Sequence, residues 1–155
     1  MRNLLKRTII LTFIVSIIGC QTESKIDNFN VEIRDFNGSA GYMLNYKINK
    51  DSLKIHYDCD FENCKDTIIY AIELNKRKTS EFYKYLKMNT TDTLKTRYRE
   101  DGFDGLNLYV KISGDSLKPK EIKLERYFHP EIKKLIVEMD KLIPEEKYKY
   151  FRENE

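Results

Sequence analysis

Apolar and polar side chains alternate in six stretches of the chain. This period of two places successive side chains on opposite faces of a strand, so each stretch predicts a β-strand with one buried and one solvated face. The six apolar sets are Phe29, Val31 and Ile33; Tyr42, Leu44, Tyr46 and Ile48; Leu53, Ile55, Tyr57 and Cys59; Ile68, Tyr70, Ile72 and Leu74; Leu106, Leu108, Val110 and Ile112; and Ile122 with Leu124. Such regular alternation is typical of antiparallel sheets that face water on one side.

Two segments break this period and predict helices. The first is capped by Thr79 or Ser80 and stops at Asn89, and its apolar side holds Phe82, Tyr85 and Leu86. The second begins at Pro130, a residue suited to a first helical turn, and ends at Pro144. Its apolar stripe consists of Ile132, Leu135, Ile136, Met139, Leu142 and Ile143.

A sheet with one apolar face needs a cover, which these helices supply. Four strands, a helix, two strands and a helix therefore predict a two-layer α+β fold. We expect a mainly antiparallel sheet of about six strands, covered by the C-terminal helix and by a shorter mid-chain helix. The length of residues 29–155 suits one globular domain.

The first part of the chain has the order of a secretory signal peptide. Basic residues as far as Arg7 precede an apolar run from Thr8 to Ser16. The run is too short for a transmembrane helix, which needs roughly 20 apolar residues. Residues 1–19 are therefore predicted to be an export signal.

The tetrapeptide Ile17-Ile18-Gly19-Cys20 resembles the lipobox of bacterial lipoproteins, although Ile17 stands where that family usually has leucine. The resemblance covers the first twenty residues alone. It implies cleavage after Gly19, a diacylglycerol thioether on Cys20, and usually a third acyl chain on the new amine. At about 0.8 kcal/mol for each buried methylene, three chains hold a protein on a bilayer almost permanently. Residues 20–28 would then be the lipidated cysteine and a polar tether.

The residue after the cysteine bears on localisation. Gln21 stands there, whereas lipoproteins retained at the inner membrane of Gram-negative cells commonly have Asp. By this resemblance the outer membrane is favoured over the inner membrane, with the domain facing the periplasm or the cell surface. In a Gram-positive cell the same signal would hold the domain on the outer face of the single membrane.

Loss of the signal also changes the charge balance. The whole chain has 28 basic and 25 acidic side chains, and residues 1–19 hold three basic ones and no acidic one. The mature chain is thus formally neutral, and no basic cluster stands beside Cys20 in the sequence. This composition disfavours nucleic-acid binding and gives no sign of a polybasic membrane-binding segment next to the lipid.

Cys59 and Cys64 are the two thiols that remain once Cys20 carries lipid. An exported chain enters an oxidising compartment, so we predict a structural disulfide between them, worth roughly 2 kcal/mol for so short a ring. A zinc site with His56 is an alternative, but the sequence offers no fourth ligand. A redox pair is disfavoured because four residues separate the thiols where oxidoreductases have two.

The loop that carries these cysteines is also acidic and resembles the start of a calcium-binding loop. Asn63, however, stands where such loops have Gly, and Ile69 stands where they have a bidentate Glu. The weak candidate metal ligands are His56, Asp58, Asp60, Glu62 and Asp66. The alternative interpretation is a solvated acidic loop.

Residues 101–105, Asp-Gly-Phe-Asp-Gly, concentrate turn-forming residues ahead of Leu106. A turn explains them, because Gly supplies positive φ and Asp bonds its own backbone. The alternative is a contact loop with an exposed Phe, since aromatic and Arg side chains are enriched at interface hot spots. The candidate partner-contact residues are Arg97, Tyr98, Arg99, Phe103 and Asp104.

The sequence holds no recognisable catalytic motif. It lacks a Gly-x-Ser-x-Gly elbow, a P-loop, a dinucleotide fingerprint and a His-Glu-x-x-His pair, and neither His56 nor His129 has a nucleophile nearby in sequence. We predict no enzyme activity and no cofactor beyond the covalent lipid. The predicted function is a non-catalytic envelope lipoprotein that binds an envelope protein, as an inhibitor, an immunity factor or an assembly accessory. The alternative is a small-ligand or metal-ion module that uses residues 58–66.

Overall fold

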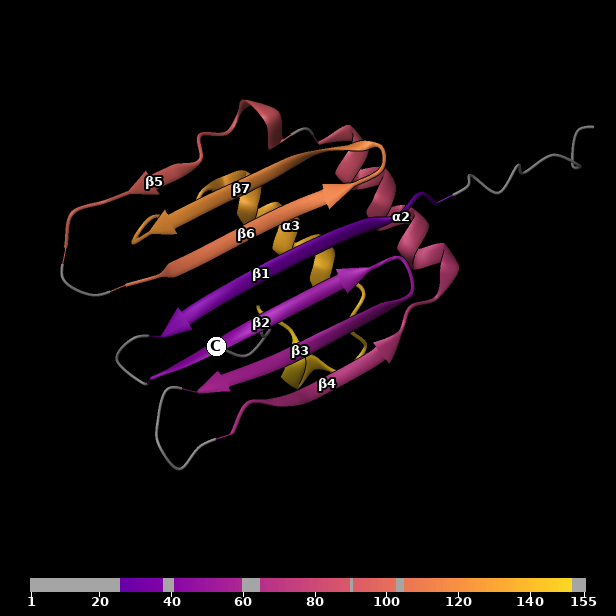
Figure 1. The fold of residues 1–155 in the computed structure, drawn as a ribbon, viewed down its shortest axis with the longest axis horizontal. Coiled ribbons are helices and arrows are strands. Elements are labelled where there is room, and N and C mark those ends of the chain that lie inside the picture. The colour runs from indigo at the N-terminus through magenta and orange to yellow at the C-terminus, as the bar shows by residue number, and fades with distance from the viewer. Residues whose placement is uncertain (1–25, 38–40, 60–64, 90, 103–104, 152–155) are drawn as a thin grey trace, which may run out of the picture.

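The computed structural model describes residues 26–37, 41–59, 65–89, 91–102 and 105–151. Seven strands form one sheet in the order β4-β3-β2-β1-β6-β7-β5 (Figure 1). They are β1 (Phe29–Asn37), β2 (Tyr42–Asn49), β3 (Ser52–Cys59), β4 (Thr67–Glu73), β5 (Arg97–Arg99), β6 (Asn107–Gly114) and β7 (Leu117–Glu125). Neighbouring strands are antiparallel, except that β5 and β7 are parallel.

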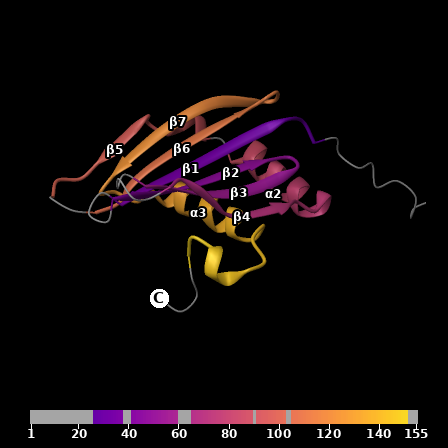
Figure 2. The ribbon, with the colours of Figure 1, turned by 60° about the horizontal axis from the view of Figure 1, so that its bottom comes forward.

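The two α-helices of the described residues lie on one face of the sheet (Figure 2). Helix α2 (Lys76–Met88) lies across the end of the sheet at which β1 begins, and α3 (Pro130–Asp140) lies behind the middle of the sheet. Two short 3-10 helices, η1 (Thr91–Thr93) and η2 (Glu146–Tyr148), complete the elements that the structure describes. Within the described residues no helix covers the opposite face, which we call the open face.

The apolar core fills the space between the sheet and the helices. The inward positions of β1, β6 and β7 are enclosed almost completely, as Val31, Val110 and Leu124 illustrate. The predicted stripe of α3 is confirmed, because all six of its apolar residues are buried, including Leu142 and Ile143 beyond the helix end. The alternation of apolar and polar residues therefore identified the buried face of the sheet correctly, because the described helices cover one face and leave the other exposed to solvent.

The α+β class predicted from the sequence is confirmed, and the finer prediction matches in part. The sheet is mainly antiparallel as predicted, but it has seven strands rather than about six, and it is mixed because β5 runs parallel to β7. The mid-chain helix is the longer of the two, with 13 residues against 11. Strand β5 escaped prediction because three residues, two of them charged, are too few to show a period.

One apolar position of β4 also lies on the unexpected face. Ile68 was predicted to point inward with Tyr70, yet it is 50% exposed. The register between β3 and β4 shifts between Ile55 and His56, which places Ile68 opposite His56. A bulge of this kind inserts one residue and turns the following side chains to the other face.

Helix α2 starts earlier than predicted. Asn75 is its N-cap, and Asn75 Oδ1 accepts a hydrogen bond of 2.9 Å from the backbone N of Arg77. Thr79, a predicted cap, lies inside the helix, where its hydroxyl donates to the backbone O of Asn75. The predicted stop at Asn89 is confirmed by its backbone bond to Tyr85 O. Asn75 satisfies the exposed donors of the first turn, so the helix needs no cap at Thr79.

Helix α3 begins as predicted, with His129 Nδ1 accepting from the backbone N of Glu131 at 3.2 Å. It ends at Asp140 rather than at Pro144, because the chain turns to run beneath the sheet. We call residues 145–151 the C-terminal strap. Its rings pack on rings of the core side, with centroid distances of 4.3 Å for Tyr148–Tyr70, 6.1 Å for Tyr150–Tyr46 and 5.7 Å for Phe151–Phe128.

Candidate functional site

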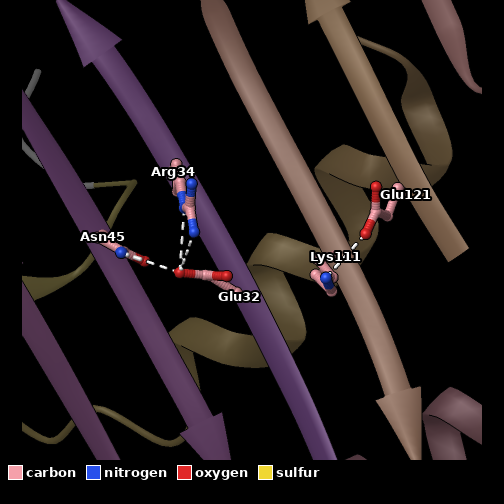
Figure 3. Close-up of polar contacts among 5 residues, drawn as sticks. All are labelled: Glu32, Arg34, Asn45, Lys111 and Glu121. Atoms are coloured by element: carbon pink, nitrogen blue, oxygen red, sulfur yellow. Dashed lines mark hydrogen bonds and ion pairs between the residues drawn. The ribbon is translucent and has the colours of Figure 1, made fainter. Parts of the chain in front are cut away.

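The open face carries a row of alternating charges across four strands. Glu32 of β1 stands opposite Lys47 of β2 on one side and Lys111 of β6 on the other. Lys111 in turn stands opposite Glu121 of β7, with 2.8 Å between Lys111 Nζ and Glu121 Oε1 (Figure 3). Opposite charges in directly facing positions stabilise neighbouring strands, so this row also supports the register of the sheet.

Glu32 is the centre of a fixed polar network on this face. Its Oε1 accepts hydrogen bonds from Arg34 Nε at 3.0 Å, from Arg34 Nη2 at 2.9 Å and from Asn45 Nδ2 at 3.0 Å (Figure 3). Burial alone would raise the pKa of Glu32, but the bonds from Asn45 and Arg34 outweigh it and hold this pKa below its usual value. The carboxylate is therefore ionised at neutral pH and fixes the guanidinium of Arg34, whose Cζ lies 5.5 Å from the ring centre of Tyr109.

Asn45 is the most enclosed polar residue of the open face. Its exposed fraction is 3%, and no donor among the described residues reaches Asn45 Oδ1. A buried acceptor without a partner costs free energy. In this network Glu32 Oε1 accepts three hydrogen bonds, whereas the neighbouring acceptor Asn45 Oδ1 receives none from the described residues.

A second charged cluster lies where β5 meets β7. Arg97 Nη2 lies 2.6 Å from Glu125 Oε2, and Lys123 Nζ lies 3.1 Å from Glu125 Oε1. The hydrogen bonds from Arg97 and then Lys123 lower the pKa of Glu125 to about 2. Arg99 stands opposite Glu125 in the register of β5 and β7, so this cluster holds three cations and one carboxylate and has a positive surplus.

Between these two clusters the open face is hollowed by a depression of about 380 Å³. It is lined by Arg34, Phe36, Met43, Asn107, Leu108, Tyr109, Lys123, Leu124 and Glu125. Phe36 is 41% exposed, so part of the lining presents bare apolar surface to solvent. Apolar walls flanked by Arg and Lys suit an apolar side chain or ring that stands beside an acidic group.

The predicted partner-contact residues divide between the two faces of the sheet. Arg97 and Arg99 are exposed on the open face, whereas Tyr98 points to the covered face. The ring of Tyr98 packs on Tyr127 at 5.7 Å and on His129 at 4.7 Å. Tyr98 therefore contributes to packing within the domain, and the two arginines are the parts of β5 available to a partner.

Two of those predicted residues, Phe103 and Asp104, lie outside the described residues. The glycines on either side, Gly102 and Gly105, have φ of 148° and 143°, in the region that favours glycine. A Cβ on Gly105 would also lie 3.1 Å from Arg126 Cγ. The positive φ of both glycines is the conformation for which the turn interpretation requires Gly.

The candidate metal ligands come together only in part. His56 and Asp58 occupy alternate positions on the open face of β3, and Asp66 Oδ1 accepts from the backbone N of Cys59 at 3.1 Å. Asp60 and Glu62 lie outside the described residues. Among the residues that the structure does describe, no three His, Cys, Asp or Glu side chains gather closely enough to hold a metal ion.

Cys20 and Cys64 also lie outside the described residues, so lipidation and the Cys59–Cys64 disulfide stay predictions. His129 is accounted for as the cap of α3. The network of Glu32, Arg34 and Asn45 was missed by sequence reasoning. Alternation does assign these three residues to the wet face, but it does not give the strand order that brings them together.

Neither α-helix of the described ranges combines the length and the apolar composition that crossing a bilayer requires. Comparison with known proteins found no protein-family model that matches the chain, and no curated protein that matches it. The function must therefore be inferred from the chain's own residues.

Proposed function

We propose that the protein is a bacterial envelope lipoprotein, anchored through lipid on Cys20, whose domain binds another envelope protein and catalyses no reaction. One observation carries the proposal. The chain joins the sheet at Phe29, at one end, while Asn37, Cys59 and Arg99 close their strands at the opposite end (Figure 1). We call that opposite end the distal end. A domain anchored at Cys20 would hold it away from the attachment.

The chemistry of the distal open face supports a protein partner. Arg97 and Arg99 supply positive charge, and Phe36 and Met43 supply apolar surface beside it. Arginine and aromatic residues are over-represented among interface hot spots. Because Glu32 and Glu125 fix the neighbouring cations, little side-chain freedom would be lost on binding. The partner surface that fits is acidic and carries an apolar side chain for the depression.

Lipid attachment is tested by metabolic labelling with a radioactive fatty acid. We expect label on the parent protein, and none on Cys20→Ala, which should also keep its signal segment. Label on the substituted protein would contradict the anchor. The outer membrane is the proposed location in a Gram-negative cell, and fractionation of the labelled membranes tests it.

Partner binding is tested by crosslinking the lipidated protein in its own envelope and identifying the captured protein by mass spectrometry. Arg99→Glu and Phe103→Ala should each reduce a stoichiometric crosslink. Lys50→Glu is the matched control, since it makes the same charge reversal in the exposed turn at the other end of the sheet. Equal capture by the parent, Arg99→Glu and Phe103→Ala would contradict a distal binding surface.

A further inference from the structure

The start of the domain is fastened to helix α2. Asp27 Oδ2 accepts hydrogen bonds from Tyr83 Oη at 2.9 Å and from Ser116 Oγ at 2.6 Å. The ring of Phe29 stacks on Tyr83 with 5.5 Å between centroids and lies 6.1 Å from Phe82. The described part of the chain therefore begins beside α2 (Figure 1).

Helix α2 is strongly basic. Its thirteen residues hold five cations, Lys76, Arg77, Lys78, Lys84 and Lys87, and a single acid, Glu81. All six of these residues are exposed. The other side of the helix, with Thr79, Phe82, Tyr83 and Leu86, is buried. The helix thus combines a core-facing apolar side with a solvent-facing side of net charge about +4.

One edge of the basic side lies next to the point where the chain enters the domain. Tyr83 is at the border of the buried side, and Lys76 and Lys87, seven residues before it and four after it, lie beside it on the exposed side. This border of the helix binds Asp27 through Tyr83. Lys87 Nζ also lies 5.6 Å from the ring centre of Tyr83. Met88, the last residue of the helix, is 70% exposed and adds apolar surface to the solvent-facing side that also holds Arg77 and Lys84.

The tether bounds how far α2 can lie from the lipid. Ile26 already packs against the core, so the connection from Cys20 to the core is shorter than the predicted tether of residues 20–28. Ile26 is six positions after Cys20, and a fully extended chain spans at most about 3.5 Å per position, or about 21 Å in all. A lipid on Cys20 would therefore hold α2 close to the headgroups of the bilayer.

We propose that α2 is a membrane-contact helix whose cations bind anionic phospholipid headgroups and whose Met88 enters the headgroup layer. This inference rests on the lipid anchor of the proposed function. Each Lys or Arg near an anionic surface strengthens binding by about fivefold. The lipid supplies attachment, and α2 supplies orientation, because it fixes which end of the domain faces the bilayer.

A single tryptophan tests the contact directly, because the chain contains none. We would place Met88→Trp in the lipidated protein and reconstitute it in vesicles that contain brominated lipid, which quenches indole on contact. Quenching is expected in vesicles of phosphatidylethanolamine with phosphatidylglycerol, and it should fall at high salt and in phosphatidylcholine alone. Phe36→Trp on the open face is the control reporter and should stay unquenched in both.

Charge reversal separates headgroup binding from mere proximity. Lys76→Glu with Lys84→Glu brings the net charge of α2 to about zero and should abolish the quenching of Met88→Trp in the anionic vesicles. Helix loss is not expected, since α2 has no acid in its first turn and an acid there favours the helix; circular dichroism checks this. Quenching that survives the reversal would overturn the electrostatic contact.

Lipid labelling of the same samples distinguishes the two proposals. A labelled protein whose Met88→Trp is unquenched in the anionic vesicles overturns membrane contact by α2 and leaves the anchor standing. An unlabelled protein overturns the anchor and, with it, the inference about α2.

Discussion

Replacing Asp140 by alanine should release the C-terminal strap. The carboxylate is 7% exposed and accepts hydrogen bonds from the backbone N of Tyr150 at 2.8 Å and of Phe151 at 3.0 Å. These two bonds hold the rings of the strap against Tyr46 and Phe128. Asp140→Ala leaves both backbone N–H groups without their acceptor in a half-buried segment. Rehydrating them requires the strap to move away from the core.

The magnitude follows from two opposing effects. A hydrogen bond to a charged group contributes about 1.5–3 kcal/mol. Against this, burial raises the pKa of Asp140, and the opposing influence of the bonds from Phe151 and Tyr150 does not cancel it. The buried charge therefore offsets part of the gain, and we expect a net loss of about 2–3 kcal/mol in the free energy of unfolding. Asp140→Asn keeps one acceptor oxygen without the charge and should lose about 1 kcal/mol.

The raised pKa also sets the sign of the pH dependence. The folded protein binds the proton of Asp140 more tightly than the unfolded chain, whose carboxyl has its ordinary pKa of 3.8. The resulting stabilisation is complete below that value and is lost as the pH rises through the folded-state pKa. Burial raises the pKa of Asp35 in the same direction. Asp140→Asn should therefore make the decline of stability above pH 3.8 shallower, without removing the part due to Asp35.

Urea unfolding followed by circular dichroism measures these differences. Glu138→Ala is the matched control on the same helix, because Glu138 forms an exposed pair with Lys141 and should change stability by less than about 0.5 kcal/mol. A loss below about 1 kcal/mol for Asp140→Ala would refute the role of Asp140 in holding the strap.

Three further substitutions test other parts of the structure. Met139→Asp buries a charge on α3 and should cost about 4 kcal/mol, so an unchanged melting temperature would contradict the assigned helix face. Arg97→Ala should raise the pKa of Glu125 from about 2 toward its ordinary 4.5. Ionised Glu125 stabilises the fold above pH 4.5, and this stabilisation is lost as the pH falls through its folded-state pKa, so in Arg97→Ala it should be lost at a higher pH. Carboxylate NMR titration measures the pKa of Glu125. An unchanged pKa would contradict the ion pair with Arg97. Gly114→Ala places a Cβ 2.7 Å from the backbone O of Asn28 and should cost about 1–3 kcal/mol in thermal unfolding, whereas equal stability would show that the strands can separate there freely.

The faces of the strands were predictable because the period of a strand is two and one side of this sheet is covered. The prediction failed at Ile68, where a bulge breaks the period, and at β5, for which no strand was predicted. Strand β5 exists because its neighbour β7 offers it an edge. A segment of three residues is too short for its sequence pattern to predict that it pairs with β7.

The candidate site was predictable in composition but not in arrangement. Alternation places Glu32, Arg34 and Asn45 on the wet face, yet Arg34 faces Asn45 only through the pairing of β1 with β2. Likewise, β1 meets Tyr109 only because β6 inserts beside it in the sheet. Register and strand order are properties of the packed sheet, and they decide which charges find partners.

The basic surface of α2 shows the same limit more sharply. No basic cluster adjoins Cys20 in the sequence, and on that ground a polybasic contact was not predicted. The basic cluster lies some fifty residues later, in Lys76–Met88, and comes to lie beside the start of the described domain because Phe29 packs on Phe82 and Tyr83. Residues that are distant in the chain can form one surface when buried aromatic side chains pack their helix and strand together.

The two proposals constrain each other through the length of β1. This strand has nine residues and runs from the α2 end to the distal end, a span of about 26 Å at 3.3 Å per residue. If α2 rests on headgroups, Arg99 and the depression beside Phe36 stand within roughly that distance of the bilayer. A partner that is embedded in the same membrane, or anchored to it, would need only a short extracytoplasmic segment to reach a binding surface at this distance from the bilayer. Under both proposals, the geometry therefore favours a partner held in the same membrane as the lipid anchor.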